Sequence, residues 1–100
     1  MGTTPIGQLQ WRQRARVAGR VKSVSVQSST VSPNLLCKLV DPSGGLTLVF
    51  PGRRRVPGIE PGARLVAEGT VGEQGGRLAI FSPDYELLAP AGSEASDFDS

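Results

Sequence analysis

The 100-residue chain contains no histidine, a single cysteine, Cys37, and only five aromatic residues. The absence of histidine removes the commonest general base and metal ligand, and one thiolate cannot build a cysteine-based metal site. The glycine-rich segment 72–76 lacks the Lys and the Ser or Thr of a phosphate-cradling loop. We therefore expect a protein that is not an enzyme, with no catalytic residue, no metal site and no cofactor.

Long apolar runs are missing as well. The chain has no stretch of 18 apolar residues, and residues 1–10 lack the charged and apolar regions of a signal peptide. We therefore expect a cytoplasmic protein without a membrane partner. Cys37 alternates with Leu35 and Leu39, which predicts that its thiol is a buried apolar group rather than a reactive one.

Short alternating runs, 13 glycines and 8 prolines favour a single all-β domain. We predict strands at residues 14–27, 34–41, 46–50 and 64–71, followed by a broken strand at 77–88. This order suits the five-stranded Greek-key barrel called the OB-fold. Residues 11–90 would form the barrel, residues 1–10 a flexible N-terminal segment, and residues 91–100 a disordered acidic tail.

The predicted first strand separates charge from apolar residues. Arg14, Arg16, Arg20 and Lys22 fall on one side of residues 14–22, and the other side is apolar. The apolar positions change parity after Ser23, which predicts a bulge near Lys22 and Ser23. Gly19 would permit a close backbone approach at the middle of the strand.

Residues 41–44, Asp-Pro-Ser-Gly, match a type I turn and predict a hairpin between the second and third strands. Its outer face would carry Leu36, Val40 and Val49, which is more apolar than a surface exposed only to water. This face is either covered by the terminal segments or is a contact surface. The second possibility gives an alternative function, an adaptor that binds another protein.

The connection between the third and fourth strands has the densest charge. Arg53, Arg54 and Arg55 stand among three prolines and three glycines, so we expect at most one helical turn there. The arginines are either a solvated loop or contacts for phosphates. Residues 1–90 contain all eleven basic residues and six of the nine acidic ones, a net charge of +5.

Three segments resemble a known family. They are residues 17–24 (VAGRVKSV), 39–50 (LVDPSGGLTLVF) and 59–71 (IEPGARLVAEGTV). They resemble the nucleic-acid-binding OB domains of the anticodon-binding type, which include the wedge domain of replication-fork helicases. The resemblance covers residues 14–88, and residues 81–86 (FSPDYE) are similar to the end of the helicase wedge. The chain departs from the pattern between its third and fourth strands, where many relatives have a helix.

The resemblance and the charge together predict a module that binds single-stranded nucleic acid, DNA or RNA, with little sequence preference. Few aromatic platforms are present, so phosphate contacts would dominate. Phe81 and Tyr85 flank a predicted kink, where either ring lines a groove or packs on the kink. The candidate contacts are Arg14, Arg16, Arg20, Lys22, Lys38, Arg53, Arg54, Arg55 and Arg77, with Trp11 and Phe81 for bases. The acidic tail, which contains Phe98, would compete with nucleic acid or recruit a protein.

Overall fold

The computed structural model describes residues 2–27 and 32–92, and their regular structure is β-strand except for one short 3-10 turn. The turn is η1, Ile6–Gln8. The strands are β1 Arg14–Gln27, β2 Asn34–Asp41, β3 Gly44–Pro51, β4 Arg64–Gln74, β5 Arg77–Phe81 and β6 Asp84–Ala89. The all-β prediction is confirmed. The predicted disordered tail lies, from residue 93 onward, outside the described residues.

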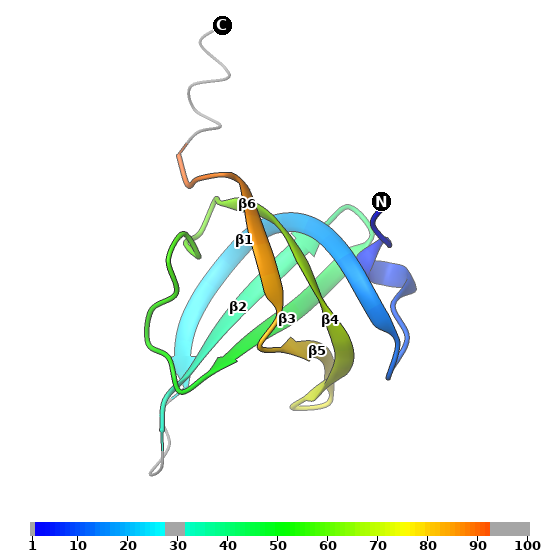
Figure 1. Cartoon of the computed structure of the whole chain (residues 1–100), viewed down its shortest axis with the longest axis horizontal. Coiled ribbons are helices and arrows are strands. Elements are labelled where there is room, and N and C mark those ends of the chain that lie inside the picture. The colour runs from blue at the N-terminus through cyan, green and yellow to red at the C-terminus, as the bar shows by residue number, and fades with distance from the viewer. Residues whose placement is uncertain (1, 28–31, 93–100) are drawn as a thin grey trace, which may run out of the picture.

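The sheet curls until its first strand meets its fourth (Figure 1). β1 pairs with both β2 and β4, and β2 pairs with β3, all in antiparallel orientation. β5 then runs parallel to β3 and antiparallel to β4, which closes a ring in the order β1–β2–β3–β5–β4. β6 pairs with β4 alone among the described strands and forms an edge. Among residues 2–27 and 32–92 we find no helix with the length and apolarity that crossing a membrane requires.

Strand β1 has the predicted alternation and bend. Ala15, Val17 and Val21 are buried inside the ring, and the pairing with β2 shifts register between Val21 and Ser23. A Cβ on Gly19 would lie 2.6 Å from the carbonyl oxygen of Val40. The predicted close backbone approach at this glycine is therefore confirmed.

The hairpin between β2 and β3 is also confirmed. Asp41 is paired with Gly44, and its Oδ1 accepts hydrogen bonds from the backbone N–H groups of Ser43 (2.7 Å) and Gly44 (3.0 Å). The inward side chains of both strands enter the core, and Cys37 is fully buried among them. Burial raises the pKa of the Cys37 thiol to about 12, because a thiolate is poorly solvated there. The thiol is thus an apolar core group at neutral pH, as predicted.

The predicted fifth strand is divided into β5 and β6 at residues 82–83. Ser82 has a φ of 50° and its N–H donates to the Val49 carbonyl at 2.7 Å, and the following Pro83 has no N–H to give to a ladder. Both halves pair with β4, β5 at residues 71–74 and β6 at residues 64–68. The connection 52–63 contains no helical turn, in agreement with its proline and glycine content.

The N-terminal segment packs more closely than we predicted. Ile6 and Leu9 are buried and belong to the core. The N–H of Thr4 donates to the Arg16 carbonyl at 2.8 Å, and the N–H of Ile6 donates to Asp41 Oδ2 at 2.9 Å. The packed domain therefore begins before Trp11, because two apolar side chains spaced three residues apart cover the ring.

The outer face of the β2–β3 hairpin is less apolar than predicted. Val49 is only 1% exposed, and Leu36 and Val40 are partly buried. Val49 is paired with Leu36 on β2 and with Phe81 on β5, so larger side chains flank it on both sides. Val49 is therefore covered and does not form a contact surface, and the sequence pattern did not reveal that β5 pairs with β3 beside it.

Candidate nucleic-acid interface

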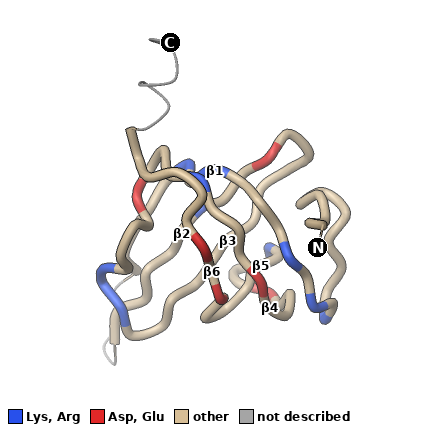
Figure 2. Tube along the Cα trace, turned by 45° about the horizontal axis from the view of Figure 1, so that its top comes forward, with Lys and Arg blue, Asp and Glu red and all other residues tan. Residues whose placement is uncertain are grey.

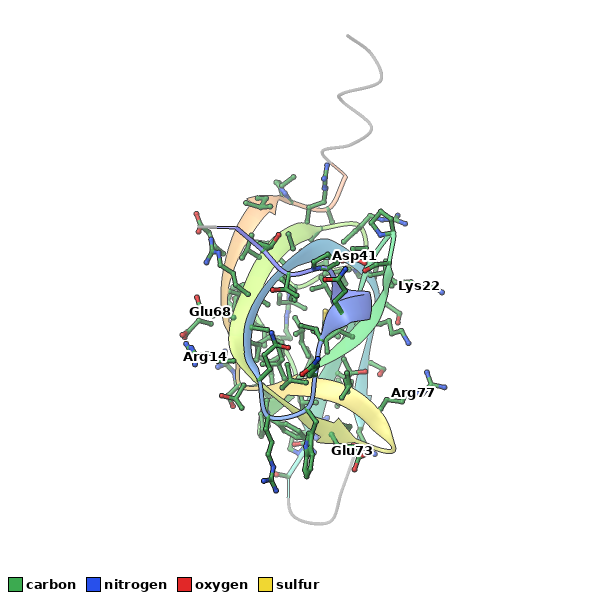
Figure 3. The ribbon with its side chains drawn as sticks, turned by 90° about the vertical axis from the view of Figure 1, so that its right-hand side faces the viewer. Arg14, Lys22, Asp41, Glu68, Glu73 and Arg77 are labelled. Carbon is green, nitrogen blue, oxygen red and sulfur yellow. The ribbon has the colours of Figure 1, made fainter. Side chains whose placement is uncertain are left out.

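The basic side of β1 does not form one continuous surface. Figure 3 shows Arg14 beside Glu68 on one side of the ring, whereas Lys22 and Arg77 project from the other side. The strand coils as it passes from β4 to β2, so residues of equal parity end up facing different directions. The four predicted cations on β1 therefore divide into three groups, which are Arg14 with Arg16, Arg20 alone and Lys22 alone.

The first group, Arg14 and Arg16, is paired with an acidic residue of β4. The guanidinium of Arg14 lies 3.4 Å from one carboxylate oxygen of Glu68, and that of Arg16 lies 3.6 Å from the other. Glu68 is opposite Arg16 in the β1–β4 ladder and opposite Asp84 in the β4–β6 ladder. Both arginines are thus partly neutralised and stand next to further carboxylates.

Lys22, Lys38 and Arg77 come together on the opposite side of the ring. Lys38 on β2 is paired with Thr47 on β3, and Thr47 is paired with Ala79, two residues after Arg77 on β5. Lys22 stands at the bulge of β1, next to the strand partner of Lys38. Ladder partners point to the same side of a sheet and alternate residues of a strand do so too, which places Lys38 and Arg77 on one surface. Figure 3 shows Lys22 projecting on the side of Arg77. We call the surface of these three cations the basic face.

The basic face is available to an anionic ligand. Lys22 and Arg77 are exposed and Lys38 is partly buried. Within the described part of the chain, none of the three forms an ion pair. Between them, Ser23 is exposed and Thr47 is partly buried, whereas Ala79 is fully buried. A strand surface with small residues between cations leaves room for a sugar–phosphate chain.

Phe81 adds an aromatic ring to the edge of the basic face. Its side chain is 44% exposed although its strand neighbour Ile80 is fully buried. A carbon of the Phe81 ring lies 3.8 Å from the position that a Cβ on Gly72 would occupy. The ring thus lies close to the Gly72 backbone and is partly exposed, and base stacking needs an exposed aromatic ring.

Tyr85 has a structural role instead. Its hydroxyl donates to the Pro57 carbonyl at 2.8 Å, and its ring packs edge-on against Phe50 with the ring centroids 5.9 Å apart. It therefore holds the connection 52–63 against the ring. Of the two aromatic alternatives around the kink, the structure leaves Phe81 exposed and uses Tyr85 for packing.

The loop that carries Arg53, Arg54 and Arg55 lies at the Phe81 end of the structure. All three arginines are exposed and line an open depression with Val24 of β1 and Leu35 of β2. Arg53 also lines a smaller depression with Ser82, the residue after Phe81. We call this segment the arginine loop, and it adjoins the aromatic edge of the basic face.

Trp11 is exposed and supported by a cation that the sequence analysis did not select. Its side chain is 60% exposed, and the guanidinium of Arg12 lies 4.2 Å from the ring centroid. The N–H of Arg12 donates to Val71, one residue before Gly72. A charge stacked on an exposed indole is a common surface arrangement. The adjacent Trp and Arg in the sequence are the signal from which this contact could have been predicted.

Arg64 is a second basic residue that sequence reasoning missed. It is exposed on β4 and stands directly opposite Arg20 of β1. Since Arg64 begins its strand as an isolated charge, no periodic pattern selected it, and only the pairing of β1 with β4 brings it to Arg20.

The outer surface of β4 and β6 has the opposite character. Glu68, Asp84 and Glu86 lie on these two strands, and we call their surface the acidic side (Figure 2). The Nε of Arg16 is buried there without a hydrogen-bond partner. The three carboxylates outnumber Arg14 and Arg16 on this side, so it attracts anions less than the basic face does.

The described residues contain no cluster of three or more Cys, Asp or Glu residues that could hold a metal ion. Exposed cations attract anions, and an exposed aromatic ring can stack on a flat ring. In comparisons with known proteins, no family model and no curated protein matches the chain.

Proposed function

We propose that the ring is an OB-fold barrel and that it binds single-stranded nucleic acid across β1, β2, β3 and β5. The closed ring of five strands and the parallel β3–β5 pair support the fold assignment. The location of the binding surface follows from the fold, because OB-folds bind oligonucleotides on the face of their second and third strands and at the loops beside it.

The observation that carries the proposal is the position of Lys22, Lys38 and Arg77 around small side chains, with Phe81 at the edge. The lysines and the arginine would contact phosphates, and Phe81 would stack on one base. The arginine loop would extend the contact at the aromatic end. Because these groups recognise the backbone and a ring face, we expect little sequence preference.

The adaptor function that we considered from sequence has less support. It needed an apolar surface of Leu36, Val40 and Val49, and Val49 is inaccessible. The remaining two side chains are only partly exposed. They form too small a patch for a stable protein interface.

Fluorescence anisotropy tests the proposal. Labelled 15-nucleotide dT and rU strands and a 15-base-pair duplex would be titrated with the protein at low salt. We expect both single strands to bind more tightly than the duplex. The triple variant K22S/K38S/R77S should bind at least about tenfold more weakly, because each lost phosphate contact weakens the electrostatic attraction. Duplex binding equal to that of single strands, or an unaffected variant, would contradict the proposal.

A further inference from the structure

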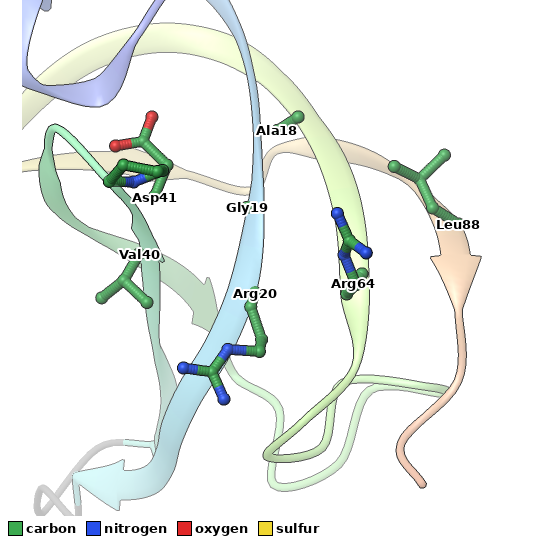
Figure 4. Close-up of a pocket in the computed structure, with 8 residues that line it drawn as sticks. Ala18, Gly19, Arg20, Val40, Asp41, Arg64 and Leu88 are labelled. Carbon is green, nitrogen blue, oxygen red and sulfur yellow. The ribbon is translucent and has the colours of Figure 1, made fainter. Parts of the chain in front are cut away.

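A separate cationic site lies where β1 passes between β2 and β4. It is an open cleft of about 460 Å³ (Figure 4), which we call the arginine cleft. Its lining comes from three parts of the chain, namely the middle of β1, the β2–β3 turn and the facing ends of β4 and β6. The lining residues are Ala18, Gly19, Arg20, Val40, Asp41, Pro42, Arg64 and Leu88.

Two arginines on neighbouring strands line this cleft. Arg20 and Arg64 are direct partners in the β1–β4 ladder, and both are exposed. Figure 4 shows their side chains leading away from each other. Neither residue forms an ion pair with any residue in the described ranges. Both guanidiniums are therefore left as donors for an anionic ligand.

Asp41, the one carboxylate in the lining, does not neutralise the arginines. Its Oδ1 accepts hydrogen bonds from the Ser43 N–H, the Ser43 hydroxyl and the Gly44 N–H, and its Oδ2 accepts one from the Ile6 N–H. Figure 4 shows this carboxylate turned away from Arg20. The four hydrogen bonds hold it toward the hairpin turn and the N-terminal segment.

Apart from Arg20, Arg64 and Asp41, the side chains that line the cleft are apolar. Ala18 and Gly19 are small, and Gly19 must stay small because of its contact with the Val40 carbonyl. Leu88 is 57% exposed, since β6 has an irregular register that places it between the residues paired with Arg64 and Leu65. The cleft therefore presents two cations beside an exposed aliphatic side chain.

We propose that the arginine cleft binds an extended acidic peptide from a partner protein, with carboxylates on Arg20 and Arg64 and an aliphatic side chain on Leu88. Charge complementarity requires an anionic ligand, and the aliphatic wall favours a peptide over nucleic acid. No aromatic ring lines the cleft, so a base would find no stacking partner there. In an extended peptide every second side chain points the same way, so the matching pattern is acidic, any, acidic, any, aliphatic.

The test uses the full chain and a labelled peptide, Gly-Ser-Asp-Ser-Asp-Ser-Leu-Ser-Gly, followed by anisotropy at low salt. One control peptide has both Asp residues replaced by Asn, and a second has Leu replaced by Ser. The variant R20S/R64S is compared with R14S/R16S, which removes two arginines from the acidic side. Circular dichroism melting confirms that each variant is folded. Amide chemical shifts locate the bound peptide.

We expect the Asp peptide to bind. The Asn peptide loses two exposed ion pairs and the Ser peptide loses one aliphatic contact, so each should bind at least about fivefold more weakly. R20S/R64S should weaken binding about fivefold or more, and R14S/R16S should leave it unchanged. The largest shifts should fall on Gly19, Val40 and Leu88. Equal binding of the Asn peptide, or an unaffected R20S/R64S variant, would overturn the proposal.

A 15-nucleotide dT strand distinguishes this site from the basic face. With the dT oligonucleotide at saturation, we expect the peptide to remain bound. Peptide binding therefore tests the arginine cleft separately from the proposal that the basic face binds nucleic acid. Displacement of the peptide in proportion to strand binding would overturn the proposal and assign the cleft to the nucleic-acid path.

Discussion

The two sides of the ring are built from the same strands but differ in how their charges are arranged. On the acidic side, Arg14 and Arg16 lie within 4 Å of Glu68. On the basic face, Lys22, Lys38 and Arg77 have no acidic partner among the described residues and enclose small side chains. The number of basic residues on a strand therefore does not identify a binding surface. What matters is which cations remain unpaired after the strand coils.

Charge reversal on the basic face should have the largest effect. The variant K22E/K38E/R77E should bind single strands at least about fiftyfold more weakly, because attraction to phosphates is replaced by repulsion. Anisotropy with a dT strand measures this. The matched variant R14S/R16S on the acidic side should change affinity less than about twofold. Equal losses in the two variants would remove the distinction between the sides.

Loss of the Phe81 ring should have the second-largest effect on single-strand binding. Phe81→Ala should weaken single-strand binding about tenfold, because one base–aromatic stack contributes about 1 to 3 kcal/mol. Tyr85→Phe serves as the control, since it removes only the hydroxyl that donates to Pro57. We expect the control to lower the melting temperature slightly and to leave affinity unchanged. A Phe81→Ala variant with full affinity would restrict binding to phosphate contacts.

Removing the charges of the arginine loop should weaken single-strand binding less than either of the two changes above. R53S/R54S/R55S should weaken binding about threefold while the melting temperature stays nearly constant, because exposed charges on a loop add little to stability. Titration of the variant and of the unmodified protein under one salt condition is the measurement. Unchanged affinity would show that the loop is only a solvated connection.

The hydrogen bonds of the Asp41 carboxylate predict an effect on stability and not on binding. Burial raises its pKa, but hydrogen bonds from Ile6, Ser43 and Gly44 outweigh this and lower the pKa below its ordinary value of 3.8. A lowered folded-state pKa stabilises the protein above the unfolded pKa of about 3.9, and this stabilisation is lost as the pH falls through the folded-state pKa. Asp41→Asn should therefore lower the melting temperature by about 2 to 5 °C at neutral pH.

The same variant has a defined pH signature. Thermal melts between about pH 2 and pH 7 should show the two proteins converging as the pH falls from about 4 through the lowered folded-state pKa of Asp41, because the carboxylate is protonated first in the unfolded state and then in the folded state. A difference in melting temperature that does not depend on pH would show that the carboxylate charge is not what stabilises the turn.

Most of the fold was predictable from local patterns. Alternation in residues 14–22 placed the inward and outward side chains of β1, and Asp41 to Gly44 identified the hairpin turn. The break in the fifth strand followed from Pro83. These features depend on a few neighbouring residues, and their physical causes are visible in the sequence.

The candidate site was less predictable because it depends on pairings between distant strands. The sequence analysis predicted one shared side of β1 for Arg14, Arg16, Arg20 and Lys22. That prediction treated β1 as flat, whereas coiling of the strand separates Arg14 from Lys22. Val49 was expected at the surface because nothing in the sequence pairs residue 49 with residue 81. Arg64 meets Arg20 only through the β1–β4 ladder. Each of these contacts joins residues more than 30 positions apart.

The salt dependence of single-strand binding tests the central claim most directly. Affinity for a dT strand would be measured from about 20 to 200 mM salt for the unmodified protein, K22S/K38S/R77S and R14S/R16S. We predict a slope of log affinity against log salt of about −2 to −3.5 for the unmodified protein and for R14S/R16S, corresponding to about three to five neutralised phosphates. The slope should become shallower by about 2 in K22S/K38S/R77S. An unchanged slope in that variant, with a reduced slope in R14S/R16S, would contradict the account.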